Sequence, residues 1–293
     1  MHKIVCFGEV LWDVFPNNTK KIGGAPLNVA LRLSSFNHDV KMVSAIGKDD
    51  LGKDLLKYLK KHKISTDLIQ QKKDYGTGEV AVALNEDGAA SYTITYPKAW
   101  DKIVKLSAMA DAVNYANAFI YGSLITRDGV SRKTLFELLD VSPYNVFDVN
   151  LRAPHYTKRT LITLMEKANF IKFNDDELFE ICELYGSKFS NVENAVKFIS
   201  NETNTKHICV TLGAKGAMLF YNSEIFYSKT YKVRVKDTVG AGDSFLASLI
   251  SQLLQGNDKQ QAINFASAVG ALVASKEGAN PKITLSEIEK FMG

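Results

Sequence analysis

The chain has 293 residues, of which 46% are hydrophobic and 23% are charged, and its formal net charge is +4. This composition is typical of a soluble globular protein, large enough for one α/β domain or two modules. The small and evenly spread positive charge argues against nucleic-acid binding, and no apolar run approaches the roughly 20 residues that a membrane-spanning helix needs.

The cysteines and the start of the chain favour a reducing compartment. Cys6, Cys182 and Cys209 are far apart in apolar stretches, so we expect buried free thiols rather than a disulfide or a metal site. The chain enters a predicted strand at Lys3 with no cleavable signal before it. We therefore expect a cytoplasmic protein that has neither a nucleic acid nor a membrane as its partner.

A carboxylate on an apolar face follows the first predicted strand. Residues 3–8 are expected to form a buried strand, and the alternation in 9–15 places Asp13 on one face with Leu11 and Phe15. Burial of an unpaired carboxylate there would be strongly destabilising. Asp13 therefore needs a polar partner, which is either a structural hydrogen bond or the hydroxyl groups of a ligand.

Residues 22–33 contain a glycine turn that leads into a predicted helix. Gly23 and Gly24 permit close approach of the backbone, Pro26 suits a first helical turn, and Asn28 offers both a donor and an acceptor. A Gly-Gly pair alone is typical of a simple turn. The residues thus leave open whether this segment is structural or binds a ligand.

The middle of the chain alternates between strands and helices, with one interruption. Residues 78–96 show two alternating segments around the turn 85–88, which predicts a β-hairpin that can form a small sheet with about 11–21. A hairpin with one apolar face must cover a site or pair with a second copy. The other predicted strands are 40–47, 118–122, 145–149, 170–173 and 207–212, and the predicted helices are 50–62, 130–139, 159–167 and 264–274.

Polar residues follow two of these strands, where open α/β sheets bind ligands. Asn174 is a good N-cap with Glu177 at the third helical position, so a capping box and a role at a phosphate or metal are equally open. Arg152 follows the strand 145–149, where it either contacts a ligand or lies on the surface.

The segment 233–254 contains the most specific motif. Val233 and Val235 alternate with basic residues as in a short strand, a glycine turn follows at 239–242, and apolar residues recur at helical spacing from Asp243 onward. The free N–H groups and the positive dipole end of a helix make such a turn an anion site. Asp243 either caps the helix or takes a proton from a nucleophile that attacks a phosphate.

Residues 237–245, Asp-Thr-Val-Gly-Ala-Gly-Asp-Ser-Phe, resemble the C-terminal signature of the ribokinase-like (PfkB) carbohydrate kinases, and Gly-Gly-x-x-x-Asn-x-Ala at 23–30 resembles their N-terminal signature. The resemblance extends over essentially the full chain. It implies one α/β domain, 1–293, with a mostly parallel central sheet flanked by helices. It also implies a small β-sheet lid from about 11–21 and 78–96, through which we expect a homodimer.

The resemblance also assigns site residues. Asp243 would be the catalytic base, and the backbone of Gly240, Ala241 and Gly242 would form an anion hole. The sugar would contact Asp13, Gly23, Gly24, Asn28, Arg152 and Asp243. ATP would contact Asn174, Thr211, Gly213, Gly216, Gly242, Asn264 and Ala268. Glu177 would hold Mg²⁺ through water, and Asp237 would belong to a monovalent-cation site, for example for K⁺.

The activity implied by the resemblance is transfer of the ATP γ-phosphoryl group to a sugar hydroxyl. The pattern Gly-Glu-x-Leu-x-Asp at 8–13 and the absence of Lys between Gly24 and Asn28 resemble fructokinases, so we expect D-fructose as substrate and fructose 6-phosphate as product. A ribokinase or another sugar or nucleoside kinase of the family is the alternative. A non-catalytic sugar-binding regulator is the alternative from another class, and a dinucleotide oxidoreductase is disfavoured because Phe245 replaces the third glycine of its fingerprint.

Overall fold

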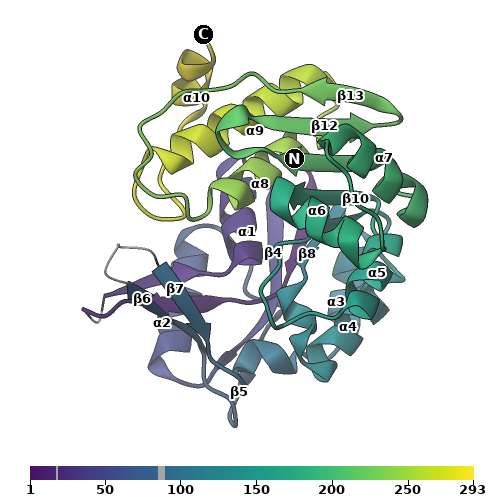
Figure 1. Cartoon of the computed structure of the whole chain (residues 1–293). Coiled ribbons are helices and arrows are strands. Elements are labelled where there is room, and N and C mark those ends of the chain that lie inside the picture. Colours follow the sequence, from purple (N-terminus) through teal and green to yellow (C-terminus); the bar gives the residue numbers. More distant parts are fainter. Residues whose placement is uncertain (18, 85–89) are drawn as a thin grey trace.

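The structure is a computed structural model that describes residues 1–17, 19–84 and 90–293 (Figure 1). The predicted hairpin turn at 85–88 lies outside these residues.

A central sheet of nine strands organises the molecule. Its strands are β1 (Lys3–Phe7), β4 (Asp39–Gly47), β5 (Ile69–Lys72), β8 (Ala118–Gly122), β9 (Asn145–Asp148), β10 (Phe170–Asn174), β11 (His207–Thr211), β12 (Ala217–Tyr221) and β13 (Glu224–Tyr227). They lie in the order β13-β12-β11-β10-β9-β8-β1-β4-β5. All neighbours from β5 to β11 are parallel, and β12 and β13 form an antiparallel edge. The predicted mostly parallel sheet is confirmed.

Helices cover both faces of this sheet (Figure 1). One face packs against α3 (Ser107–Asn114), α4 (Gly129–Leu139), α5 (Lys158–Glu166), α6 (Asp175–Leu184) and α7 (Val192–Thr203). The other packs against α1 (Ala25–Ser35), α2 (Asp50–Lys61), α8 (Ala241–Leu254) and α9 (Lys259–Ala274), and α10 (Leu285–Met292) lies on α9. Short 3₁₀ turns occur at Ala99–Lys102, Leu124–Arg127 and Gly213–Lys215.

Strand residues divide between the two layers by alternation. In β1, Val5 and Phe7 pack toward α3 and α4, whereas Ile4 and Cys6 pack toward α1 and α8. Both faces are buried, as expected for a parallel sheet with helices on each side.

A second sheet stands beside the first and is the predicted small sheet. It consists of β2 (Leu11–Val14), β3 (Lys20–Gly23), β6 (Gly78–Leu84) and β7 (Ala90–Ile94), in the order β3-β2-β6-β7. β6 and β7 are the antiparallel arms of the predicted hairpin, and β2 runs parallel to β6. The register aligns Asp13 with Val80, and Val80 with Ile94, so these three residues form one row across the sheet.

One sequence expectation is wrong, and one element of the sheet was not expected. The segment with Val233 and Val235 is not a strand. Its backbone lies beside the last residue of α9, where Lys236 N–H and Asp237 N–H both donate to Ala274 O. Val235 is accordingly 60% exposed, whereas a central strand would bury it. The antiparallel hairpin β12–β13 was not anticipated.

The cysteine prediction is confirmed, since Cys6, Cys182 and Cys209 are all buried free thiols. Within the described residues, no helix combines the length and the apolar character that crossing a membrane would require.

Candidate active site

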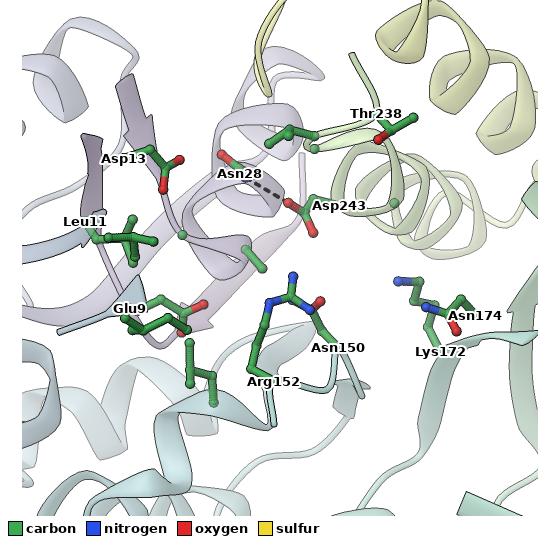
Figure 2. A pocket seen from close by; sticks show the side chains of 18 of the residues that line it. Glu9, Leu11, Asp13, Asn28, Asn150, Arg152, Lys172, Asn174, Thr238 and Asp243 are labelled. Atoms are coloured by element: carbon green, nitrogen blue, oxygen red, sulfur yellow. Dashed lines mark hydrogen bonds between the residues drawn. The ribbon is translucent and has the colours of Figure 1, made fainter. Parts of the chain in front are cut away.

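A cavity of about 590 Å³ opens between the carboxyl ends of the parallel strands and the small sheet (Figure 2). Crevices at strand ends are where open α/β sheets bind ligands, and here β1 has β4 on one side and β8 on the other, so the chain reverses direction across the sheet at β1. The predicted site residues that line the cavity are Asp13, Gly24, Asn28, Arg152, Asn174, Glu177, Thr211, Gly240, Gly242 and Asp243.

The glycine turn before α8 brings Asp243 to the cavity. Gly240 is the N-cap residue of α8 with a left-handed φ of 75°, and a Cβ there would overlap the backbone of Ala279. Asp243 is the third residue of the helix and not its N-cap residue. Within the described residues, no side chain makes a capping hydrogen bond to the N-terminus of α8. The capping interpretation of Asp243 is therefore not supported. Its Oδ2 instead accepts a hydrogen bond from Asn28 Nδ2 at 2.8 Å.

The environment of Asp243 suits a base that works near neutral pH. Burial raises the pKa of Asp243 to about 6, and the negative charge of Asp148 adds to this rise, while the hydrogen bond from Asn28 opposes it. A carboxylate with this pKa is ionised at pH 7 and yet accepts a proton more readily than an exposed one.

Asn28 is itself held in place. It is 4% exposed in the first helical turn of α1, and its Oδ1 accepts a hydrogen bond from Asn280 Nδ2 at 2.6 Å. The side-chain amide therefore links the segment before α10 to the Asp243 carboxylate. A contact with sugar would have to use the second Nδ2 hydrogen or the remaining lone pair of Oδ1.

The two glycines before α1 make room for the groups on the side of the cavity that the small sheet forms. A Cβ on Gly23 would stand 2.5 Å from Asp13 Oδ2, so the glycine leaves room for that carboxylate although it does not line the cavity itself. Gly24 is the N-cap residue of α1 with a φ of 110° and approaches the Glu9 carbonyl. Burial raises the pKa of Asp13 to about 6, and Lys21 opposes this rise.

Glu9 lines the cavity and was missed by the sequence analysis as a site residue. It is 4% exposed, and its Oε2 has no partner among the described residues. Burial raises the pKa of Glu9 to about 7, although backbone hydrogen bonds and the charge of Arg152 oppose the rise. A signal was available, because Glu9 directly follows a buried strand at the edge where ligands bind.

Asn174 and Glu177 form the capping box that the sequence left open. Asn174 Oδ1 accepts from Glu177 N–H at 2.7 Å, and Glu177 Oε2 accepts from Asn174 N–H at 2.8 Å. Glu177 Oε1 accepts a further hydrogen bond from Leu151 N–H at 2.9 Å. Both residues also line the cavity, so the structural role does not exclude a ligand role.

Lys172 is a second lining residue that the sequence analysis missed. Its Nζ donates to Asp148 Oδ1 at 3.0 Å, and both side chains are almost fully buried. The signal was weak, because a lone Lys in a short strand is ordinarily exposed.

Several predicted residues lie away from the cavity. Gly213 and Gly216 belong to the turn after β11, where both have positive φ, and Asn264 Oδ1 accepts from Lys229 N–H at 2.8 Å. Ala268 is 0% exposed and offers no surface to a nucleotide in this structure. Ala241 does not line the cavity either, and its N–H donates to Thr238 O at 3.2 Å.

Asp237 acts as a clamp between two loops. Its Oδ1 accepts from Val239 N–H and its Oδ2 from Gly278 N–H, each at 3.0 Å. Within the described residues, no group of three or more His, Cys, Asp or Glu side chains that could hold a metal ion comes together.

Comparison with known proteins agrees with this geometry. The family described as "pfkB family carbohydrate kinase" matches residues 1–285. A probable fructokinase-2 from Arabidopsis thaliana is 28% identical over 96% of this chain and 92% of the relative. A fructokinase from Xylella fastidiosa, solved with bound ATP, has a TM-score of 0.86 at 23% identity and covers 100% of this chain and 98% of its own.

A second solved structure is a double mutant of fructokinase from Vibrio cholerae O395 in its fructose, ADP and potassium ion bound form. It has a TM-score of 0.84 at 22% identity and covers 100% of this chain and 99% of its own. At these identities the structural likeness establishes the fold, and the expected ribokinase-like architecture is confirmed.

Proposed function

This chain belongs to the pfkB family of carbohydrate kinases and is a phosphotransferase with an alcohol group as acceptor, and we propose that it transfers the γ-phosphoryl group of ATP to the 6-hydroxyl of D-fructose. One observation carries the proposal. The cavity brings together three features: the Asp13 carboxylate on the small sheet, the Asp243 carboxylate, which accepts a hydrogen bond from Asn28, and the glycine turn at the start of α8.

In this proposal the sugar lies beside Asp13. Asp13 accepts hydrogen bonds from sugar hydroxyls, and the apolar side chains of Leu11, Val80 and Ile94 from the same sheet line the cavity beside it. The acceptor hydroxyl then lies toward Asp243. Because Asn28 holds Oδ2, the Oδ1 atom is the one that receives the proton from the sugar oxygen.

The start of α8 serves as the anion site for the phosphoryl group. Since the Ala241 N–H is engaged with Thr238 O, we assign the contact to the neighbouring Gly242 N–H, which has no backbone partner among the described residues. The positive end of the helix dipole adds to this attraction. Such preorganised donors stabilise the charge that develops on the phosphoryl oxygens.

The donor groups also fit Mg²⁺, which prefers carboxylate oxygen and retains several waters. Both Glu177 oxygens already accept backbone N–H groups, so Glu177 would hold the ion through water, and Asp148 Oδ2 is a buried oxygen without a partner among the described residues. When bound with ATP, Mg²⁺ neutralises charge on the phosphates. A K⁺ site beside Asp237 belongs to the same proposal, because each Asp237 oxygen retains a lone pair.

The nearest competing substrates are other sugars of the family. Ribose would indicate a ribokinase, and an acidic sugar would match the Arg152 guanidinium, which faces the cavity between Glu9 and Asp243 in Figure 2. A non-catalytic regulator has no chemical need for a base such as Asp243, so we place it last. The small sheet would act as a lid and as the contact of a homodimer.

A sugar panel tests the proposal. Purified protein with ATP and Mg²⁺ is supplied with fructose, ribose, glucose and gluconate, and ADP release and sugar phosphate are measured together. We expect the highest kcat/KM with fructose. Preference for ribose or gluconate would replace fructose as the assigned substrate. Absence of any sugar phosphate would favour the non-catalytic regulator.

A further inference from the structure

Lys172 is a buried cation that the mechanism above does not use. It is the third residue of β10 and 6% exposed, and it lines the cavity together with Asn174 and Gly242 (Figure 2). Alternation along β10 packs Ile171 and Phe173 toward α6 and α7. Lys172 therefore points to the opposite layer, where α8 begins.

The ammonium group of Lys172 has donors left over. An ammonium has three N–H donors, and among the described residues its only hydrogen bond goes to Asp148 Oδ1. Burial alone would lower the pKa of Lys172, but the carboxylates of Asp148, Glu177 and Asp243 raise it overall, so the side chain stays charged. A buried cation with open donors is unfavourable unless a ligand satisfies them.

The position of this cation relative to α8 points to the missing ligand. A Cβ built on Gly242 would lie 3.4 Å from Lys172 Nζ, and among the described residues outside the adjoining backbone no other heavy atom lies within 4 Å of it. The ammonium therefore stands beside the positive end of a helix dipole, where a cation is disfavoured. An anion between Lys172 and the Gly242 N–H would turn this repulsion into two attractions.

The same observation explains the glycine. Gly242 lies inside α8 and has no positive φ, so the backbone conformation does not require glycine there. A side chain would instead narrow the space between its own N–H and Lys172. The missing Cβ thus keeps open a gap bordered by two donors.

We propose that Lys172 is a further catalytic residue, whose ammonium contacts an oxygen of the transferred phosphoryl group opposite the Gly242 N–H. This inference rests on the proposed phosphoryl transfer. The sugar oxygen forms a bond to the γ-phosphorus, its proton passes to Asp243, and the bond from the γ-phosphorus to the bridging oxygen breaks with its electron pair leaving on ADP. Lys172 stabilises the charge on the non-bridging oxygens, and Asp148 is a positioning residue for the ammonium.

The structural alternative is that Lys172 only neutralises the buried charge of Asp148. The two roles differ in what they recognise, because a contact with the γ-phosphoryl group distinguishes ATP from ADP, whereas a counter-ion does not. An unpaired Asp148 would repel both nucleotides. The γ-specific part of any loss is therefore the informative quantity.

The test compares nucleotide binding in Lys172→Met and wild type by calorimetry, with Mg²⁺ and either ADP or the non-hydrolysable β,γ-imido analogue of ATP. Loss of one charged hydrogen bond predicts that the affinity for the analogue falls by roughly ten- to hundredfold more than the affinity for ADP. Lys172→Arg should recover part of this difference. The matched control is Lys167→Met, which removes another Lys–Asp pair, with Asp140, on the surface.

Equal weakening of both nucleotides by Lys172→Met would overturn the proposal. If that variant does not fold, Gly242→Ala gives the same test, because its methyl group intrudes on the gap while the ion pair remains. Gly129→Ala, at the start of α4, is its control, since the nearest atom to a Cβ there lies at 3.8 Å. A wild-type protein that favours the analogue yet phosphorylates no sugar would contradict the proposed function, and only the contact between Lys172 and the γ-phosphoryl group would remain.

Discussion

Asn28 and Asp243, which lie 215 positions apart in the sequence, are joined by a hydrogen bond of 2.8 Å between the Asn28 Nδ2 and the Asp243 Oδ2. The bond connects the first turn of α1 to the first turn of α8, so both helix N-termini face one cavity. In the proposed mechanism, this bond leaves Oδ1 of Asp243 as the proton acceptor. The two glycine motifs therefore lie at one site.

We expect Asn28→Ala to shift the pH dependence of turnover. The Asn28 hydrogen bond favours the charged form of Asp243 and so lowers its pKa. Without it the pKa rises further, and the acidic limb of the kcat profile should move to higher pH. Asn194→Ala, an exposed position on α7, is the control. If the acidic limb of the kcat profile does not move in Asn28→Ala, the Asn28 hydrogen bond does not influence the catalytic base.

The pH profile of the wild type follows from the raised pKa of Asp243. Below a pH of about 6 the carboxyl is protonated and cannot accept the sugar proton, so kcat should fall as the pH drops through this value and level off above it. Glu9 has a pKa of about 7, so Glu9→Gln is needed to assign the limb. Disappearance of the limb in Glu9→Gln would transfer it to Glu9.

Asp13→Ala should weaken sugar binding far more than ATP binding. A site built to hydrogen-bond hydroxyl groups loses heavily when a partner is missing, and we expect a loss of roughly ten- to hundredfold in fructose affinity. Calorimetry with fructose and with ATP separates the two. Unchanged fructose affinity in a folded variant would exclude Asp13 from the sugar site.

The small sheet should respond to sugar. β7 is an edge strand, and Tyr96 just beyond it is 55% exposed, which favours pairing with a second copy. We expect light scattering to give a dimer mass, and hydrogen exchange in β6 and β7 to slow on adding fructose but not ribose. A monomer, or equal protection by both sugars, would contradict this account of the lid.

The sequence predicted the βα alternation well, because buried parallel strands and amphipathic helices leave clear periodic patterns. It failed at Val233 and Val235, where the alternation of two valines resembles a strand, but the backbone N–H groups that follow, of Lys236 and Asp237, donate to Ala274 O. Local periodicity carries no information on which distant carbonyl accepts a hydrogen bond.

The site was predictable as far as its motifs reached. Asn28 and Asp243 stand in glycine-rich turns, whereas Lys172 and Glu9 stand in ordinary strand contexts. Their relevance depends on burial beside the cavity, since both are less than 10% exposed and come together only in the fold. The capping box of Asn174 and Glu177 could be read directly, because it spans only four residues of local sequence.

The most direct test of the central claim is turnover of fructose by Asp243→Asn beside the wild type, with product identified as fructose 6-phosphate and with fructose and ATP affinities measured in parallel. The substitution keeps the shape and the hydrogen bond to Asn28 but removes the proton acceptor. We predict retained affinity for both ligands and a kcat lower by roughly two to four orders of magnitude. Near-normal turnover in a folded Asp243→Asn protein would contradict the assignment of Asp243 as the base.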